Sequence, residues 1–209
     1  MKPKWIVFDV GGVLLDWERS SAALAKKFGV DHSLLLETVF SYAPKMNIGL
    51  MSPEDGWKQI LIDIGMPGDP LEAIRRWRST DFWIQDSLKL ASELHAAGYK
   101  MAIFTNSWLG LEDELDKKLL PKEINLFKYI VDSSKEGLRK PDPAFYNLLE
   151  ARLTDKGAAI FLIDDTGKNI PVATKMGWQT HLFDTNDSLS SANQIRSILL
   201  SENDSYSLG

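Results

Sequence analysis

The sequence predicts an α/β protein in which a doubly wound parallel sheet carries an inserted α-helical cap. Strand-like apolar runs alternate with helix-like segments through the second half of the chain. Such alternation is typical of a parallel sheet covered by helices on both faces. A long helical region, roughly residues 17–95, follows the first strand without a convincing strand of its own. We therefore assign residues 1–15 and 87–209 to the α/β core, and residues 16–86 to the cap.

The first strand contains Ile6, Val7 and Phe8 and ends abruptly at Asp9. Gly11 and Gly12 follow before the chain turns apolar again. An apolar run that ends at a carboxylate indicates a buried strand whose carboxyl end delivers the acid into a crevice. The glycines allow the backbone to approach a ligand closely.

The cap region contains several helix start signals. For its first helix, residues 22–28, Ser20 or Ser21 is the predicted N-cap. Ser52-Pro53 and Asp69-Pro70 each place a capping residue before a proline at the first helical position. A further helix is predicted over residues 87–97, ending before Gly98.

Beyond the cap, strands and helices alternate regularly. The predicted strands are residues 99–104, 129–131, 158–163 and 178–183. Asp142-Pro143 begins a helix that runs to Leu153, and the apolar spacing from Leu189 to Leu199 predicts a closing amphipathic helix. An acidic helix with a solvated face is predicted over residues 111–120, and the tail from Ser201 is predicted to fray.

Composition limits the possible functions. The chain has 209 residues, 44% of them hydrophobic, enough for one sizeable core. The net charge of −5 argues against a nucleic acid or an acidic membrane surface as partner. The absence of cysteine excludes disulfides and thiolate chemistry, and agrees with a reducing compartment. Asp9 interrupts the first apolar run and no small-residue cleavage site follows, so we expect no signal peptide and a cytoplasmic location. For the oligomeric state, we expect a monomer or a homodimer.

Four segments of the chain place polar residues at the end of a predicted strand or in a loop beyond it. Asp9 ends the first strand, Thr105 the second, Lys140 lies in a loop stiffened by two prolines, and Asp164-Asp165 follows a strongly apolar strand. Ligands bind at the carboxyl ends of the strands in an open parallel sheet, so these groups converge on one crevice. Two carboxylates, a hydroxyl and a lysine suit a magnesium ion and a phosphate group.

The order and spacing of these four segments resemble the haloacid dehalogenase superfamily over nearly the whole chain. That resemblance implies a Rossmann-like core with a small helical cap. Asp9 matches the family's nucleophile, and Thr105 and Lys140 match its second and third motifs. In the fourth motif Asp165 matches the metal ligand, while Asp164 and Asn169 match supporting positions. The motifs are most similar to those of sugar-phosphate phosphatases, and the fourth is also similar to that of the phosphatase domain of soluble epoxide hydrolases.

The resemblance implies a mechanism in which Asp9 attacks phosphorus and forms an aspartyl-phosphate that water then hydrolyses. Mg²⁺ would be held by Asp9, Asp165 and the carbonyl of Val10 or Gly11. Lys140 and Thr105 would stabilise charge on the phosphoryl oxygens. The expected substrate is a small phosphorylated metabolite, with sugar phosphates as one candidate class.

Gly11 is the departure from the family pattern, because the superfamily usually has a second aspartate at this position. General acid–base catalysis is worth roughly 10²–10⁴-fold in rate. Its loss matters least for leaving groups that depart without a proton, such as those of aryl, acyl or anomeric phosphates. Asp164 and Asp16 are candidate substitute acids.

Further residues are assigned to the substrate. Gly11, Asn106, Trp17 and Trp108 lie just after the first two motifs and are predicted to contact it, whereas Trp57 and Trp77 are predicted to pack in the core. Lys168 is interpreted as a solvated charge. Two alternatives stay open: a metal-independent haloacid dehalogenase, and a non-catalytic or regulatory phosphate-binding protein. A phosphotransferase is a third possibility if the aspartyl-phosphate survives long enough to meet another acceptor.

Overall fold

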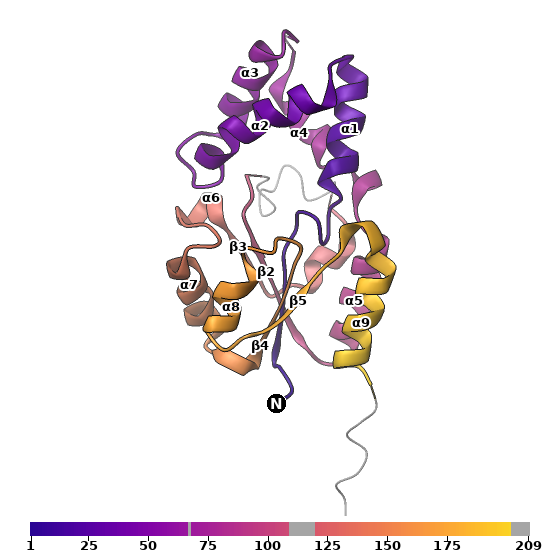
Figure 1. Cartoon of the computed structure of the whole chain (residues 1–209), viewed down its shortest axis with the longest axis vertical. Coiled ribbons are helices and arrows are strands. Elements are labelled where there is room, and N and C mark those ends of the chain that lie inside the picture. Colours follow the sequence, from indigo (N-terminus) through magenta and orange to yellow (C-terminus); the bar gives the residue numbers. More distant parts are fainter. Residues whose placement is uncertain (67, 109–119, 202–209) are drawn as a thin grey trace, which may run out of the picture.

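A computed structural model describes residues 1–66, 68–108 and 120–201 and contains one five-stranded sheet (Figure 1). The strand order is β3-β2-β1-β4-β5, and every neighbouring pair is parallel. In the central strand, Phe8 is in register with Ile103 on one side and Ile163 on the other. The predicted doubly wound parallel sheet is therefore confirmed. Its strands are β1 (Trp5–Phe8), β2 (Lys100–Thr105), β3 (Tyr129–Asp132), β4 (Ile160–Asp164) and β5 (Gln179–Leu182).

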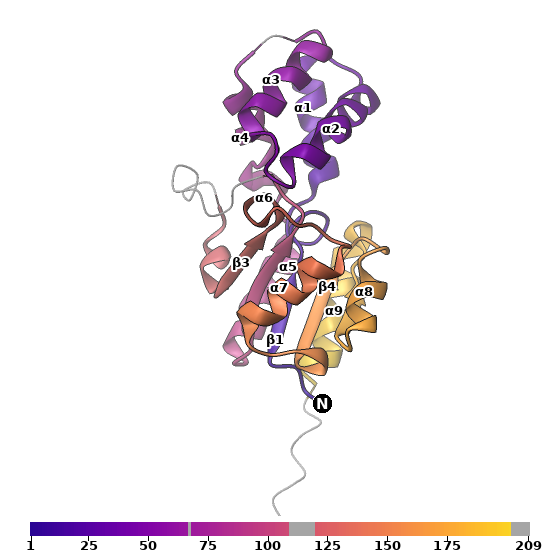
Figure 2. The same cartoon turned by 90° about the vertical axis from the view of Figure 1, so that its left-hand side faces the viewer.

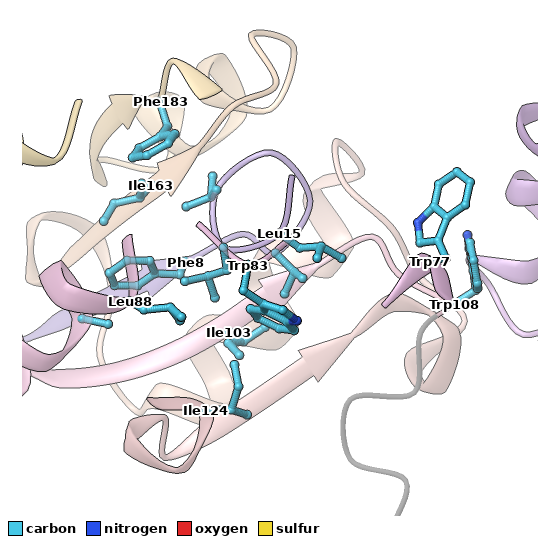
Figure 3. Packing of buried hydrophobic residues seen from close by; sticks show 14 of the residues in the cluster. Phe8, Leu15, Trp77, Trp83, Leu88, Ile103, Trp108, Ile124, Ile163 and Phe183 are labelled. Atoms are coloured by element: carbon cyan, nitrogen blue, oxygen red, sulfur yellow. The ribbon is translucent and has the colours of Figure 1, made fainter. Parts of the chain in front are cut away.

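Helices cover both faces of the sheet (Figure 1). One face packs on α5 (Gln85–Ala96) and α9 (Ser188–Leu199), the other on α7 (Pro143–Leu153) and α8 (Ile170–Lys175). Alternate residues of β1 serve the two faces, because successive side chains of a strand point in opposite directions. Ile6 and Phe8 belong to the first core, and Figure 3 shows Phe8 packed among Leu88, Ile103 and Ile163.

Trp5 and Val7 belong to the second core, which also contains the aromatic side chains of α7. The Phe104 ring lies 4.4 Å from the ring of Phe145 and 5.1 Å from that of Tyr146, centroid to centroid. All four residues of β1 are buried. This double burial explains why the run before Asp9 is continuously apolar rather than alternating.

Four helices stand above the carboxyl edge of the sheet, apart from the helices that flank it (Figures 1 and 2). The two chain segments that join them to the sheet run side by side. The Asp16 amide donates to the carbonyl of Phe82 over 2.8 Å, and the Ile84 amide donates to that of Leu14 over 2.8 Å. The predicted cap boundaries at residues 16 and 86 lie next to this paired crossing. The helices are α1 (Trp17–Phe28), α2 (His32–Met46), α3 (Pro53–Asp63) and α4 (Pro70–Trp77).

Most predicted helix starts are confirmed, but the first is wrong. Ser52 and Asp69 cap α3 and α4 as expected. The N-cap of α1 is Asp16, whose Oδ1 accepts from the Arg19 amide over 3.0 Å. Ser20 and Ser21 consequently lie inside the helix, where the Ser20 hydroxyl donates to the Trp77 carbonyl over 2.7 Å and links α1 to α4.

Smaller elements complete the chain. They are α6 (Ser133–Glu136) and the 3₁₀ turns η1 (Thr80–Phe82), η3 (Lys122–Leu126), η4 (Gly157–Ala159) and η5 (Thr185–Asp187). The helix α5 begins two residues before its predicted start, and β5 is shorter than predicted at both ends. The acidic helix predicted over residues 111–120 falls almost wholly outside the described residues, as does most of the predicted frayed tail. Within the described part of the chain, no helix combines the length and apolar character needed to cross a bilayer.

Candidate active site

The carboxyl ends of β1, β2 and β4 open into a cavity of about 350 Å³ beneath the cap. Its wall includes Asp9, Thr105 and Asp165, three of the residues predicted to meet there. They come from separate strand ends, and the parallel register brings them together at one edge of the sheet. Asp9 and Thr105 are almost fully buried, whereas Asp165 is more open.

Lys140 lies behind the cavity wall rather than on it. Its side chain is fully buried, and its Nζ lies 2.8 Å from Oδ2 of Asp9 and 2.6 Å from Oδ2 of Asp164. Burial alone would lower the pKa of Lys140, but the Asp164 and Asp9 charges outweigh burial and raise that pKa. The lysine is therefore a cation that orients the carboxylate of Asp9.

Asp164 is fully occupied by protein partners. Its oxygens accept from Lys140, from the Thr166 amide at 2.9 Å, and from Nδ2 of Asn169 at 2.9 and 3.1 Å. Its side chain is wholly inaccessible to solvent. Asp164 thus holds Lys140 from behind, and Asn169 in turn holds Asp164. This geometry does not suit Asp164 to protonate a leaving group.

Asp16 is also unsuited to that task. It caps α1 and lies in a separate surface depression with Glu18 and Asp86 rather than on the wall of the main cavity. The sequence-based proposal that Asp16 or Asp164 replaces the missing acid at Gly11 therefore has no geometric support.

Asp9, Asp164 and Asp165 form a cluster whose carboxylate oxygens approach within 4.8 Å of one another. Asp164 is occupied by Lys140 and Asn169, so Asp9 and Asp165 are the members on the cavity wall. Mg²⁺ favours one or two carboxylates together with water and substrate oxygens. The donor set on this wall fits such an ion, with Asp9 and Asp165 as the protein carboxylates.

The electrostatics of the cluster agree with a cation site. Burial and the nearby Asp164 and Asp165 charges raise the pKa of Asp9 to about 7, against the opposing effect of Lys140. Burial and the Asp164 charge raise the pKa of Asp165 to about 6. Both carboxylates carry an electrostatic cost in their charged form, and a bound divalent cation relieves it.

The glycine pair after β1 shapes the floor of the site. Gly12 has a φ of +74°, and a Cβ added there would overlap the carboxylate of Asp165. A side chain at this position would therefore displace Asp165, one of the two carboxylates on the cavity wall. Gly11 lies on the cavity wall, and a Cβ added there would meet Cδ1 of Trp17 at 3.5 Å, an ordinary contact distance.

The two backbone carbonyls predicted as metal ligands differ in availability. The Val10 carbonyl accepts from the amides of Val13, Leu14 and Leu15, the last two at 2.8 Å. No hydrogen bond to the Gly11 carbonyl appears among the described residues. Of these two oxygens, that of Gly11 is the one free to serve a cation.

The remaining predicted residues also lie on the cavity wall. Trp17, Trp108 and Asn106 all line this space. The Asn106 carboxamide is bonded to the backbone of Lys140, donating to its carbonyl at 2.8 Å and accepting from its amide at 2.7 Å. Asn106 thus fixes the Lys140 loop, whose peptide bond to Pro141 is cis.

Sequence reasoning missed part of the wall. Arg139 lines the cavity beside Lys140, and the exposed Lys168, interpreted as a solvated charge, lines it too. Trp77, predicted as a core residue, is buried but also borders the cavity. Arg139 could have been predicted from the sequence, because it directly precedes Lys140 of the third motif. The cap contributes four more apolar or aromatic residues and one amide: Val39, Phe40, Ala43, Pro44 and Asn47.

An α/β core with an aspartate at the end of its first strand, a lysine-bridged acidic cluster and a cap above them defines a hydrolase of the haloacid dehalogenase type. A model of the haloacid dehalogenase-like hydrolase family matches residues 3–177, and the chain belongs to this family. It is similar to AstK, a sesquiterpene phosphatase of Aspergillus oryzae, with 26% identity over 94% of this chain and 96% of that protein.

A second relative is the mouse bifunctional epoxide hydrolase 2, with 32% identity over 46% of this chain and 18% of that protein. Among solved structures, a haloacid dehalogenase family enzyme of Bacteroides thetaiotaomicron, in complex with magnesium and inorganic phosphate, superposes with a TM-score of 0.67. That pair is 22% identical and covers 88% of this chain and 95% of the other. Likeness at this level demonstrates the shared fold.

Proposed function

We propose that this hydrolase is a magnesium-dependent phosphatase that cleaves small phosphorylated metabolites through an aspartyl-phosphate on Asp9. The observation that carries the proposal is the pair of acids Asp9 and Asp165 on one cavity wall, with Lys140 2.8 Å from the Asp9 carboxylate. Dehalogenation of a haloacid would need Asp9 as nucleophile but would not need a second carboxylate such as Asp165 to bind a metal ion. The similarity to a phosphatase over nearly the whole chain supports the same choice.

In the proposed first step, a carboxylate oxygen of Asp9 forms a bond to phosphorus as the bond from phosphorus to the ester oxygen breaks. The organic group leaves with the electron pair of that bond and takes a proton from solvent. Lys140 holds the attacking carboxylate in place, while Thr105 and Arg139 lie on the wall where the phosphoryl oxygens would bind. Asp9 and Asp165 would hold a Mg²⁺ ion, which would supply Lewis-acid stabilisation of the negative charge that develops in the reaction.

In the second step, water attacks phosphorus and the bond to Asp9 breaks, which releases inorganic phosphate and regenerates the carboxylate. Position 11 is a glycine, so it provides no carboxylate to act as general base for that water. We therefore expect slow turnover and a preference for good leaving groups. Sugar phosphates are the class that motif resemblance favours, and anomeric esters are the members of that class that need least proton assistance.

The test is release of inorganic phosphate from 1-naphthyl phosphate, acetyl phosphate and glucose 1-phosphate, with and without Mg²⁺. Asp9→Asn is the control variant, since it keeps the size of the side chain and removes the nucleophile. Turnover that needs both Mg²⁺ and Asp9 supports the proposal, and trapping of phosphate on Asp9 after a rapid quench would establish the intermediate.

Two outcomes would favour the alternatives. Halide release from 2-chloropropionate without added metal would make the protein a dehalogenase. Tight binding of Mg²⁺ and phosphate with no turnover of any ester would favour the regulatory, phosphate-binding interpretation, whose structural basis is the glycine at position 11.

A further inference from the structure

The cavity wall is divided sharply by chemistry. Its charged side chains (Asp9, Asp165, Arg139 and Lys168) all come from the α/β core. The opposite side, here called the cap wall, is apolar. It consists of Trp17, Val39, Phe40, Ala43, Pro44 and Trp77.

The aromatic side chains of the cap wall pack against one another or against neighbouring aromatic rings. Trp17 and Phe40 pack edge to face, with centroids 5.5 Å apart and planes at 81°. Trp77 lies 5.8 Å from Trp108, and both rings contact the buried Trp57 (Figure 3 shows Trp77 beside Trp108). Such mutual packing fixes each ring's orientation, so the cap wall is a preformed apolar surface.

One polar side chain of the cap, Asn47, reaches this wall within the described residues. Its Oδ1 is buried and has no hydrogen-bond partner in the described part of the chain. A sugar held against the cap wall would lose water from several hydroxyl groups and find one amide in return. Buried hydroxyls without partners weaken binding, whereas an apolar group gains affinity from the same surface.

We propose that the substrate is a phosphate ester of an apolar, ring-sized alcohol or phenol, whose organic group binds the cap wall while its phosphate binds beside Asp9 and Asp165. This inference rests on the proposed phosphatase function and specifies its substrate class. It departs from the sugar phosphates that motif resemblance favours, because the described side of the cavity opposite the phosphate offers a single amide, Asn47, to the several hydroxyl groups of a sugar.

A matched pair of substrates tests the proposal: glucose 6-phosphate and cyclohexylmethyl phosphate. Both esterify a primary alcohol on a six-membered ring, so their leaving groups are similar and their ring hydroxyls differ. With the full chain and Mg²⁺, we expect kcat/KM to be at least about 100-fold higher for cyclohexylmethyl phosphate. Equal or better turnover of glucose 6-phosphate would overturn the inference and leave the phosphatase function intact.

A matched pair of variants locates the effect. Phe40 and Leu34 are both exposed apolar residues of α2, at 52% and 45%, but Phe40 lines the cavity and Leu34 does not. Phe40→Ala should raise KM for cyclohexylmethyl phosphate by about tenfold. Leu34→Ala, outside the cavity, should leave KM for this ester and kcat for acetyl phosphate unchanged. Equal KM in the two variants would contradict binding at the cap wall.

Failure of the proposed function is recognised separately, as absence of phosphate release even from acetyl phosphate. In that case tryptophan fluorescence decides the inference, because Trp17 and Trp108 border the cavity. Cyclohexylmethyl phosphate should still bind at least about tenfold more tightly than glucose 6-phosphate. The reverse order of affinities would refute it.

Discussion

The indole of Trp17 stands directly beside Gly11, with Cδ1 3.5 Å from the point that a Cβ on that glycine would occupy. An aromatic ring therefore borders the position from which members of the superfamily usually present a proton donor. The contact distance is ordinary, and Gly11 is not among the glycines with a positive φ. The backbone thus tolerates a side chain here, so an aspartate can be introduced at this position to test the effect of the missing acid.

We predict that Gly11→Asp increases kcat for cyclohexylmethyl phosphate by about 10²-fold and kcat for 1-naphthyl phosphate by much less. The alkoxide leaving group needs a proton, whereas the naphtholate departs readily without one. Steady-state kinetics on the two esters measure the ratio directly.

Gly11→Asn is the matched control for this experiment, because it has the same size as aspartate and cannot supply the proton. It should leave the ratio of the two kcat values unchanged. An equal gain on both esters in Gly11→Asp would show that the aspartate acts on some step other than departure of the alcohol.

The buried ion pairs of Lys140 predict a large stability effect. In Lys140→Met, the carboxylates of Asp9 and Asp164 lose their shared cation while both stay buried. We expect the free energy of unfolding at pH 8 without metal to fall by about 3–5 kcal/mol, because unpaired buried charges are costly. Urea unfolding followed by circular dichroism measures the change.

Lys168→Met provides the comparison, since Lys168 is an exposed lysine near the same cavity. Its free energy of unfolding should change by less than about 0.5 kcal/mol. Similar losses in the two variants would mean that the buried pairs contribute nothing beyond an ordinary surface charge.

The sequence predicted the strand ends well, because double burial makes each strand a continuous apolar run that stops at a polar residue. Asp9, Thr105 and Asp165 follow from this pattern, since carboxyl ends of parallel strands meet at one edge. The start of α1 could not be predicted in the same way. Three capping residues lie close together, and a tertiary contact between Asp16 and Phe82 selects one of them.

Apart from Trp17, the residues of the cap wall could not be predicted from the sequence, for a related reason. The amphipathic pattern of a helix identifies its apolar face but not what that face packs against. The apolar residues of α2 serve both the interior of the cap and the cavity, as Val39 and Phe40 illustrate. Only the position of α2 above the sheet distinguishes these roles.

The acidic pair predicts how Mg²⁺ stabilisation depends on pH. In the metal-free protein, the pKa values of Asp9 and Asp165 are raised from 3.8 to about 7 and about 6. The folded state then holds these protons more tightly than the unfolded chain, so their contribution to stability is present below pH 4. It is lost as the pH rises towards 7.

A divalent cation binds the deprotonated pair and offsets that loss. We therefore expect about 10 mM MgCl₂ to raise Tm more at pH 8 than at pH 5. Differential scanning fluorimetry at constant ionic strength measures the shift. Asp165→Asn should abolish the difference, and an equal shift at both pH values in the wild type would contradict a role for these carboxylates.

Gly12 and Gly29 separate the cost of an unusual backbone conformation from the cost of disturbing the site. Both have positive φ, +74° and +67°, and alanine at either position should cost about 1–2 kcal/mol. The two positions differ in the room available for a side chain. A Cβ at Gly29 meets nothing within 4 Å, whereas one at Gly12 overlaps the carboxylate of Asp165. Gly12→Ala should therefore lose Mg²⁺ binding, measured by calorimetry, while Gly29→Ala binds Mg²⁺ as the wild type does. Retained binding in Gly12→Ala would mean that Asp165 can move without cost, and that this carboxylate is not the one that holds the ion.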